Sequence, residues 1–394
     1  KNVLIAVPSL ALVRQTLQAW TKQAVADGSP IEYIAVCSDQ DVGKVDESVR
    51  SVHELGIAVT TCIHKVHHFL HSQTNSMKVV LSTYQSGDKV ISALNSSAFS
   101  FDLGVFDEAH KTTGDKTKKF SLLLDDANVS IKRKVFMTAT ERVFDGITPN
   151  FLSMDDEATY GPLIDQLSFM EALEQHPPIL SDYRVVTVTV SRNDIESVIA
   201  QNEITKSNGD LFTFENDGAT IAALVAYRKL VDEKGIQHAI SFHKSIKRAS
   251  EFRDLNNNKE LNQHYFGSSI KAFHVSGELS TGERNAEISR FLAGDKTLVT
   301  NAKCLTEGVD IPAIDAVIFA DPKQSVVDIV QAAGRAMRVH PDKKLGYIII
   351  PVIVDETRPD LVGDAFKQLI NVIGALGMSD GRIIEEAKEV IRSR

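Results

Sequence analysis

Short apolar runs alternate with longer amphipathic segments along almost the whole chain. The first run, VLIAVPS, covers Val3–Ser9, and the apolar residues of LALVRQTLQAWTKQAV after it recur with helical spacing. Later runs have the same strand character and end in small or polar residues: IEYIAVCS, KVVLSTYQS, FDLGVFDEAH and KVFMTAT. Strands that alternate with helices predict parallel βαβ units, and so an α/β fold whose ligands bind at the carboxyl ends of the strands.

A second series of the same kind follows an acidic, proline-containing interruption. Its predicted strands are YRVVTVTV, QHAISFH, IKAFHVSG, KTLVTNA, DAVIFADP and LGYIIIPVIV, with predicted helices such as GATIAALVAYRKLVDEKG between them. The two series together predict two tandem α/β domains. We place the first over residues 1–150, a linker over 151–182, the second over 183–357, and a helical extension over 358–394.

Composition narrows the possible classes of protein. The 394 residues are 43% hydrophobic and 24% charged, an ordinary globular balance. No apolar run approaches the roughly 18 residues that span a bilayer, and the start of the chain reads as a strand rather than a signal peptide. We therefore expect no membrane partner and a cytoplasmic location, which the three widely separated cysteines also favour. The net charge of -9 argues against simple coating of nucleic acid but allows a local basic groove.

The run FDLGVFDEAH ends in two adjacent carboxylates, Asp107 and Glu108, followed by Ala109 and His110. Carboxylates at the end of a buried strand are costly to desolvate, which favours a chemical role. Asp107 suits a Mg²⁺ ligand that acts through a bound water. Glu108 suits the group that orients or deprotonates an attacking water in phosphoryl transfer, and His110 is placed to couple a nucleotide site to neighbouring polar loops. The alternative is an acidic N-terminus of a surface helix.

The segment VFMTAT ends another predicted strand with Thr138, Ala139 and Thr140. Two hydroxyls that flank a small residue can hydrogen-bond to the carboxylate segment and to a mobile partner domain. The alternative is a plain turn stabilised by a threonine side chain.

Near the other end, QAAGRAMR places Gln331, Gly334, Arg335 and Arg338 on a short predicted helix. Gln331, Arg335 and Arg338 recur at i, i+4 and i+7, so we expect them to share one face. Two arginines on that face predict the arginine-finger role, in which a cation neutralises charge on a transferred phosphoryl group. The alternative, a solvated basic face, does not explain the small apolar residues of QAAG.

Between these segments, TNAKCLTEGVDIP covers Thr300–Pro312 and reads as a strand end followed by a tight turn at Gly308 and Asp310. Asp310 is a candidate to touch a ribose hydroxyl or the arginines. The backbone here and the Thr300 hydroxyl are candidates to contact a sugar-phosphate chain.

Seven segments, in this order, resemble the motifs of superfamily 2 helicases and translocases of the DEAH type. VPSLALVRQTL resembles motif Ia, LSTYQS motif Ib, DEAH motif II, MTAT motif III, SFHKSIKRA motif IV, TNAKCLTEGVDIP motif V and QAAGRAMR motif VI. The resemblance implies two RecA-like domains with ATP and Mg²⁺ between them and nucleic acid across their top. It also implies that the nucleic-acid path is lined by Pro8, Ser9, Ser82, Thr83, Tyr84, His243, Lys244 and Thr300. The Tyr84 ring either stacks on a base or is simply packed.

The junction SMDDEATYGPLIDQLSFMEALEQHPPILSDYRV is similar to the linker of restriction-type helicases (types I, III and ISP), the DNA-translocating subunits of restriction systems. This similarity favours DNA over RNA as the partner, in contacts that are largely sequence-independent and salt-sensitive. It also implies nuclease or methyltransferase domains or subunits as further partners. The implied function is a helicase or translocase core that couples ATP hydrolysis to movement on DNA. The alternative is a non-catalytic binding module derived from such a core.

Motif I of the family is a glycine-rich phosphate-binding loop that ends in Gly-Lys-Ser/Thr and should precede the first strand by one helix. The chain starts at Lys1, beside that strand, so we expect motif I to be missing from it. AGDKT, at Ala293–Thr297, follows a helix and precedes a strand, the reverse of the required order, and is rejected. We therefore expect weak or no ATPase activity from this chain alone.

Overall fold

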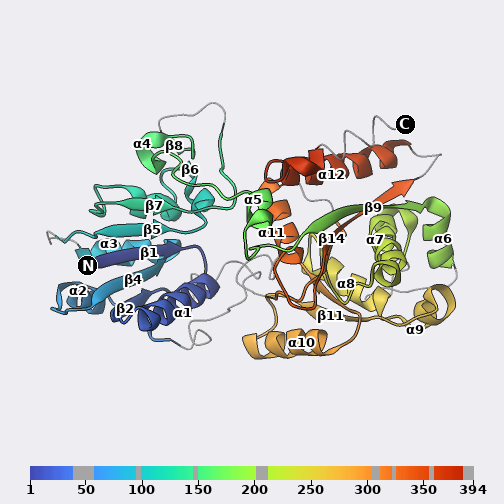
Figure 1. The fold of residues 1–394 in the computed structure, drawn as a ribbon, viewed down its shortest axis with the longest axis horizontal. Helices are drawn as coiled ribbons and strands as arrows, with labels where there is room; N and C mark the ends of the chain where they lie inside the picture. The colour runs from blue at the N-terminus through green and yellow to red at the C-terminus, as the bar shows by residue number, and fades with distance from the viewer. Residues whose placement is uncertain are drawn as a thin grey trace. The chain divides into compact units, whose positions relative to one another are not determined.

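The computed structural model describes residues 1–38, 57–94, 99–144, 150–200, 212–302, 311–321, 325–354 and 359–384. The chain folds as two compact units, Lys1–Asp165 and Gln166–Arg394. Each unit is built on one six-stranded sheet (Figure 1). The boundary between the units falls inside the segment 151–182 that the sequence analysis interprets as a linker. No helix among the described residues is long and apolar enough to cross a membrane.

The sheet of the first unit is parallel throughout. In spatial order its strands are β3 (Val59–Thr60), β2 (Ile31–Val36), β4 (Met77–Thr83), β1 (Asn2–Val7), β5 (Leu103–Phe106) and β7 (Lys134–Phe136). In β1, Val7 pairs with Thr83 of β4, and Ala6 pairs with Phe106 of β5. The loops that follow β1, β4 and β5 therefore leave the sheet at the same carboxyl edge.

Both faces of this sheet are covered. The helices of the first unit are α1 (Leu10–Ala26), α2 (Ile63–His71), α3 (Gly87–Leu94) and α4 (Glu157–Tyr160), with 3₁₀ turns η3 (Tyr84–Ser86), η4 (Ala109–Thr112) and η5 (Lys119–Leu124) and an antiparallel pair β6 (Gly114–Asp115) and β8 (Phe151–Leu152). Along β1, Leu4 and Ala6 belong to one apolar cluster, and Val3 and Ile5 belong to another. A strand that is buried on both faces explains why its sequence is a continuous apolar run.

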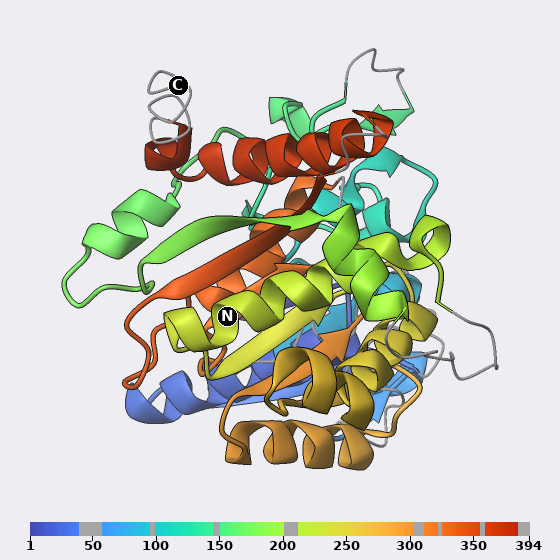
Figure 2. The ribbon, with the colours of Figure 1, turned by 90° about the vertical axis from the view of Figure 1, so that its right-hand side faces the viewer.

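The second unit repeats this architecture. In spatial order its strands are β11 (Lys271–Val275), β12 (Thr297–Asn301), β10 (His238–Phe242), β13 (Ala316–Phe319), β14 (Gly346–Val354) and β9 (Tyr183–Ser191). All neighbouring pairs are parallel. Figure 2 shows β9 and β14, in green and orange-red, side by side along their length. The predicted second set of parallel strands is confirmed.

Helices lie on both faces of the second sheet as well (Figure 2). They are α5 (Phe169–Glu174), α6 (Arg192–Ala200), α7 (Phe214–Lys234), α8 (Ile246–Asn256), α9 (Lys259–Leu261), α10 (Thr281–Ala293), α11 (Val326–Ala336) and α12 (Pro359–Gly377), with a π-helical turn η6 (Asn262–Phe266). Alternation along β13 divides the core, because Ile318 packs in the cluster of α7 whereas Phe319 packs in the cluster of α11 and α12. Gly235, at φ 67°, ends α7 in the left-handed conformation that glycine adopts most readily.

Candidate functional site

The DEAH segment lies at the carboxyl edge of the first sheet, where β5 ends at Phe106. Asp107 is tied to both neighbouring strands: its N–H donates to the carbonyl of Ala6 at 3.0 Å, and the hydroxyl of Tyr84 donates to its carbonyl at 2.7 Å. Its carboxylate accepts the N–H of Glu108 at 2.9 Å. These contacts fix the backbone of a half-buried carboxylate at the strand end, which is the position that the sequence predicts for it.

Glu108 adopts a left-handed backbone, with φ 50° and ψ 46°. Such a conformation costs a non-glycine residue about 1–3 kcal/mol and is found mostly where function requires it. The next residue holds the turn in place, since the N–H of Ala109 donates to the carbonyl of Met137 at 2.9 Å. Glu108 precedes η4 but makes no side-chain cap hydrogen bond to it. The alternative of an ordinary acidic helix cap therefore does not describe this carboxylate.

His110 joins the DEAH segment to the threonine segment after β7. Its Nδ1 lies 3.3 Å from Oε2 of Glu108 and 3.0 Å from the Thr138 hydroxyl. That hydroxyl donates to the carbonyl of Thr140 at 2.8 Å, so it faces His110 as an acceptor. Both neighbours of Nδ1 are thus acceptors, which assigns the ring proton to Nδ1. The side chain of Ala139, between the two threonines, is exposed.

The ring of Tyr84 lies in the core of the first unit. It is fully buried, and it stacks on Phe120 with ring centroids 5.5 Å apart. Burial, reinforced by Asp107, raises the pKa of its hydroxyl well above the usual value, so it remains a donor to the Asp107 carbonyl. Of the two alternatives for Tyr84, the structure therefore favours packing; the resemblance-based expectation of base stacking does not apply to this conformation.

We expect Tyr84→Phe to lower the free energy of unfolding by about 1 kcal/mol, because it leaves the buried Asp107 carbonyl without its donor. DNA affinity should not change. Urea unfolding and a DNA-binding titration check both results. Tyr33→Phe is the matched control, because Tyr33 is 39% exposed and its ring hydroxyl makes no hydrogen bond to the described residues. Unchanged stability with weakened DNA binding in Tyr84→Phe would show that Tyr84 contacts nucleic acid.

The other predicted nucleic-acid residues of the first unit follow the ends of β1 and β4. Ser9 caps α1 by accepting the N–H of Leu12 at 3.4 Å, and Pro8 is buried before it. Ser82 and Thr83 are fully buried, and the Ser82 hydroxyl donates to the Thr83 carbonyl at 2.9 Å. At these positions the side chains serve the local fold, so contacts to sugar and phosphate would fall to the backbone and remain a prediction.

In the second unit, His243 and Lys244 follow the end of β10. His243 is 3% exposed, and its Nε2 lies 2.9 Å from the Ser241 hydroxyl. Burial, helped by nearby His274 and Arg248, lowers the pKa of His243 to about 3, so the ring is neutral near pH 7. Lys244 is exposed. Lys244, and not His243, therefore carries the positive charge of this turn.

Thr300 lies within β12 and is fully buried, with its hydroxyl 2.9 Å from Nδ1 of His274. The predicted contact of this hydroxyl with a sugar-phosphate chain is not supported by its position, which faces the neighbouring strand β11. Gly308 and Asp310, the predicted turn of the same motif, lie outside the described residues.

Gln331 and Arg335 lie four residues apart on α11, as predicted, and Arg335 is 5% exposed. The prediction that Arg338 shares their helical face is wrong, because α11 ends at Ala336. Arg338 instead belongs to an extended segment that pairs antiparallel with Leu180. Arg335 therefore becomes the stronger of the two candidates for an arginine finger.

The sequence analysis missed Asp321, which follows β13 at the carboxyl edge of the second sheet. Its carboxylate accepts the N–H of Lys244 at 3.0 Å and an N–H of Arg248 at 2.8 Å. The signal was present in DAVIFADP, an apolar run that ends in an aspartate just as the run before Asp107 does.

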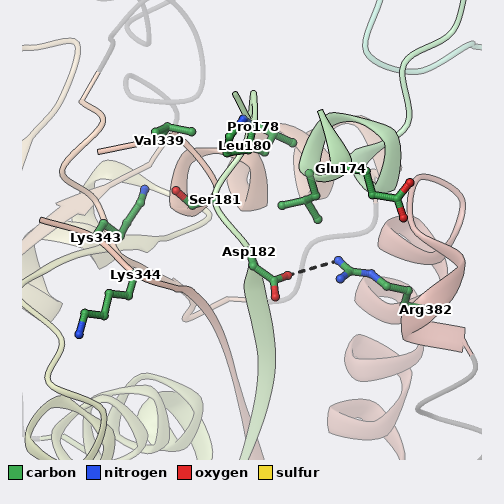
Figure 3. A pocket seen from close by; sticks show the side chains of 10 residues that line it. Glu174, Pro178, Leu180, Ser181, Asp182, Val339, Lys343, Lys344 and Arg382 are labelled. Carbon is green, nitrogen blue, oxygen red and sulfur yellow. Dashed lines mark hydrogen bonds and ion pairs between the residues drawn. The ribbon is translucent and has the colours of Figure 1, made fainter. Parts of the chain in front are cut away.

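A groove of about 490 Å³ in the second unit lies at the opposite, amino-terminal edge of β9 and β14 (Figure 3). It is lined by Leu173, Glu174, Pro178, Leu180, Ser181, Asp182, Val339, Lys343, Lys344 and Arg382. Arg382 pairs with Asp182 at 3.3 Å and with Asp380 at 2.7 Å. Lys343 donates to two backbone carbonyls, and burial lowers its pKa to about 8. These charges stabilise the fold locally, and of the predicted site residues Arg338 adjoins the groove, since it pairs with Leu180 and its carbonyl accepts from the Ser181 hydroxyl.

Two parallel α/β units, one with an Asp-Glu-Ala-His segment tied to a threonine turn and the other with an arginine-bearing helix, define the class of tandem RecA-like helicase cores. Residues 1–142 match the family described as "Type III restriction enzyme, res subunit". Residues 222–340 match the family described as "Helicase conserved C-terminal domain". These matches support a superfamily 2 helicase core that resembles restriction-type subunits, the resemblance that the sequence analysis gives.

Particular relatives agree with this assignment. A solved structure titled "ATP-dependent Type ISP restriction-modification enzyme LlaBIII bound to DNA" is 28% identical, with a TM-score of 0.76, over 97% of this chain and 26% of that one. A nuclease-deletion mutant of the Type ISP enzyme LlaGI, in complex with a DNA substrate mimic, is 29% identical, with a TM-score of 0.60, over 97% of this chain and 25% of that one. A "Probable helicase" of African swine fever virus is 25% identical over 98% of this chain. The chain spans 39% of the length of that viral relative.

Proposed function

We propose that this chain is the motor core of an ATP-dependent DNA translocase of the restriction type. One Type ISP structure is titled as ATP-dependent and bound to DNA and the other as a complex with a DNA substrate mimic, and the matched families are described as a helicase C-terminal domain and a restriction-enzyme subunit. The observation that carries the proposal is the left-handed Glu108 beside Asp107, with His110 bridging from Glu108 to Thr138. Glu108 has a strained backbone, and its carboxylate is linked through His110 to the threonine segment. Such an arrangement is difficult to explain by folding alone.

Asp107 fits the role of Mg²⁺ ligand, because it is a half-buried carboxylate whose backbone is fixed at the strand end. Hard cations of this kind are held by one or two carboxylates together with waters and phosphate oxygens. When bound with ATP, the ion would neutralise charge on the phosphates. Glu108 then orients the attacking water and accepts its proton.

The same proposal assigns the remaining residues. His110 couples the protonation of Glu108 to the position of Thr138, because its one Nδ1 proton faces both acceptors. Arg335, with Arg338 as a second cation, neutralises charge that builds on the transferred phosphoryl group. Gln331, one helical turn before Arg335, is assigned to nucleotide binding, and so are Gly308 and Asp310, which lie outside the described residues.

DNA contact in this proposal depends on the exposed Lys244 and on backbone groups at the carboxyl edges of the sheets. Such contacts are made to phosphates, so binding is largely independent of sequence and weakens as salt rises. Nuclease and methyltransferase domains or subunits are the partners that a restriction-type motor implies. We propose that they are joined to this core in the full-length protein.

The proposal is tested by measuring ATP hydrolysis by the full-length protein with duplex DNA, single-stranded DNA or RNA. We expect stimulation by DNA and little or none by RNA, with the stimulation lost at high salt. Stimulation by RNA alone would contradict the restriction-type assignment. DNA binding without hydrolysis under any condition would support the alternative of a non-catalytic module.

A further inference from the structure

Asp321 connects three elements of the second unit at the carboxyl edge of its sheet. It follows β13, it is 4% exposed, and its own N–H donates to the carbonyl of Phe242 at the end of β10 at 3.4 Å. Because β10 and β13 are paired neighbours, the side chain of Asp321 lies beside the turn that leaves β10. A carboxylate buried here must be compensated by donors.

Two donors come from that turn and from the helix after it. The Lys244 N–H donates to Oδ2 of Asp321 at 3.0 Å, and Nη1 of Arg248 donates to Oδ1 at 2.8 Å. Ser245, between them in sequence, caps α8 by accepting the N–H of Arg248 at 3.2 Å. The carboxylate therefore fixes both sides of the turn, its backbone at Lys244 and the first helical turn of α8.

The side chain that this turn presents to solvent is Lys244. Its neighbour His243 is buried and packs against Phe252 with ring centroids 4.8 Å apart. Nδ1 of His243 is 3.9 Å from Oδ2 of Asp321, so the imidazole fills the space beneath the turn rather than reaching outward. Asp321 thus controls where the one exposed cation of the turn lies.

We propose that Asp321 is a positioning residue for DNA binding, which holds the Lys244 turn so that the Lys244 ammonium meets a backbone phosphate. The proposal rests on the DNA-binding function proposed above and deepens it. Asp321 touches no DNA itself. Its effect passes through the backbone hydrogen bond to Lys244 and the ion pair with Arg248.

The sign of the effect separates positioning from simple electrostatics. A carboxylate near DNA repels phosphates, so removing Asp321 should tighten binding if its charge alone mattered. If Asp321 positions Lys244, removing it should weaken binding instead. One lost phosphate contact lowers the salt slope by about 0.9, which corresponds to about eightfold weaker binding at about 0.1 M salt.

The test uses the whole chain and a fluorescently labelled duplex, with binding followed by anisotropy over a range of salt concentrations. We expect Lys244→Ala and Asp321→Ala each to weaken binding about eightfold and to reduce the salt slope by about 1. The double variant should bind no worse than Lys244→Ala alone, because Asp321 acts through Lys244.

Asp315→Ala is the matched control. Asp315 stands at the other end of the same strand and accepts the N–H groups of Gln237 at 2.8 Å and His238 at 3.0 Å, so it anchors the beginning of β10 as Asp321 anchors its end. We expect Asp315→Ala to lower the unfolding temperature without changing the salt slope. An equal change of slope in Asp315→Ala would show that general loosening of the sheet, and not positioning, is measured.

The failures of the two proposals are distinguishable. If Lys244→Ala weakens binding but Asp321→Ala leaves it unchanged or tightens it, the positioning role is overturned and the DNA-binding function stands. If the unaltered chain does not bind the duplex, the proposed function itself fails. Should Asp321→Ala not fold, Asp321→Leu gives the same test, because leucine is close to aspartate in size and has no acceptor oxygen. Weaker binding with a lower slope supports the role, and wild-type or tighter binding overturns it.

Discussion

Glu108→Gln is expected to lower kcat for ATP hydrolysis by about 10²–10⁴-fold, while ATP binding persists. The amide keeps the size of the side chain and an oxygen that can accept from Nδ1 of His110, now 3.3 Å from the carboxylate. It cannot accept a proton from water, so the loss falls on the chemical step. The measurement is single-turnover hydrolysis by the full-length protein, with binding of a fluorescent ATP analogue measured in parallel.

Glu141→Gln is the isosteric control, since Glu141 is an exposed residue close to the threonine segment. It should leave turnover, ATP binding and stability unchanged. Normal turnover in Glu108→Gln would remove Glu108 from the role of general base. A large loss of ATP affinity would show that this carboxylate acts mainly in nucleotide binding.

Local sequence patterns were sufficient to predict the strands and to predict that the DEAH segment follows the end of a strand. Continuous apolar runs that end in polar residues identify strands buried on both faces, and parallel pairing then brings their carboxyl ends to one edge. That reasoning predicts Asp107 and Glu108 at the carboxyl edge of the sheet, where the structure has them. It did not reveal the left-handed backbone of Glu108, which depends on the hydrogen bond from Ala109 to Met137 on a neighbouring segment.

Long-range contacts explain where the sequence reasoning failed. The periodicity of QAAGRAMR continues through Arg338, but the helix stops at Ala336 because the chain turns to pair with the segment around Leu180. The N–H of Ser181 donates to the carbonyl of Met337 at 2.6 Å, which a continuing helix would have used internally. A pairing partner more than 150 residues away in sequence leaves no trace in an eight-residue window.

The direction of a side chain at a strand end could not be predicted from the local sequence either. Tyr84, Thr300 and His243 stand at the edge where ligands bind, but each turns inward to a partner supplied by another element: Phe120, His274 and Phe252. Strand ends therefore predict the edge at which a site lies, whereas the choice of contacting side chain depends on packing.

The two units use the same structural position for different purposes. Asp107 follows β5 and donates its N–H to the end of β1, and Asp321 follows β13 and donates its N–H to the end of β10. Each aspartate thus follows a strand that is paired with the strand accepting its N–H. In the first unit the carboxylate accepts the N–H of Glu108, whereas in the second it accepts from Lys244 and Arg248.

Arg335→Ala is expected to lower kcat by about 10³-fold or more while DNA affinity stays nearly constant. Arg335 is 5% exposed near the end of α11, so the stability of the variant must be measured alongside its activity. Arg335→Lys keeps the charge but loses the planar fork, and it should recover only part of the rate. Turnover with saturating ATP and DNA, together with DNA-binding titrations, checks these results.

Arg290→Ala provides the surface control, because Arg290 lies on α10 with its side chain 59% exposed, and its partners among the described residues, Glu287 and the Ala286 carbonyl, belong to the same helix. It should change neither kcat nor stability appreciably, since exposed pairs of this kind contribute about 0–1 kcal/mol.

Arg338→Ala separates the two arginines of the segment: because Arg338 lies beyond the helix, its loss should reduce kcat less than the loss of Arg335. Normal turnover in Arg335→Ala, or a loss of DNA binding equal to its loss of rate, would refute the arginine-finger assignment and move this residue to the DNA path.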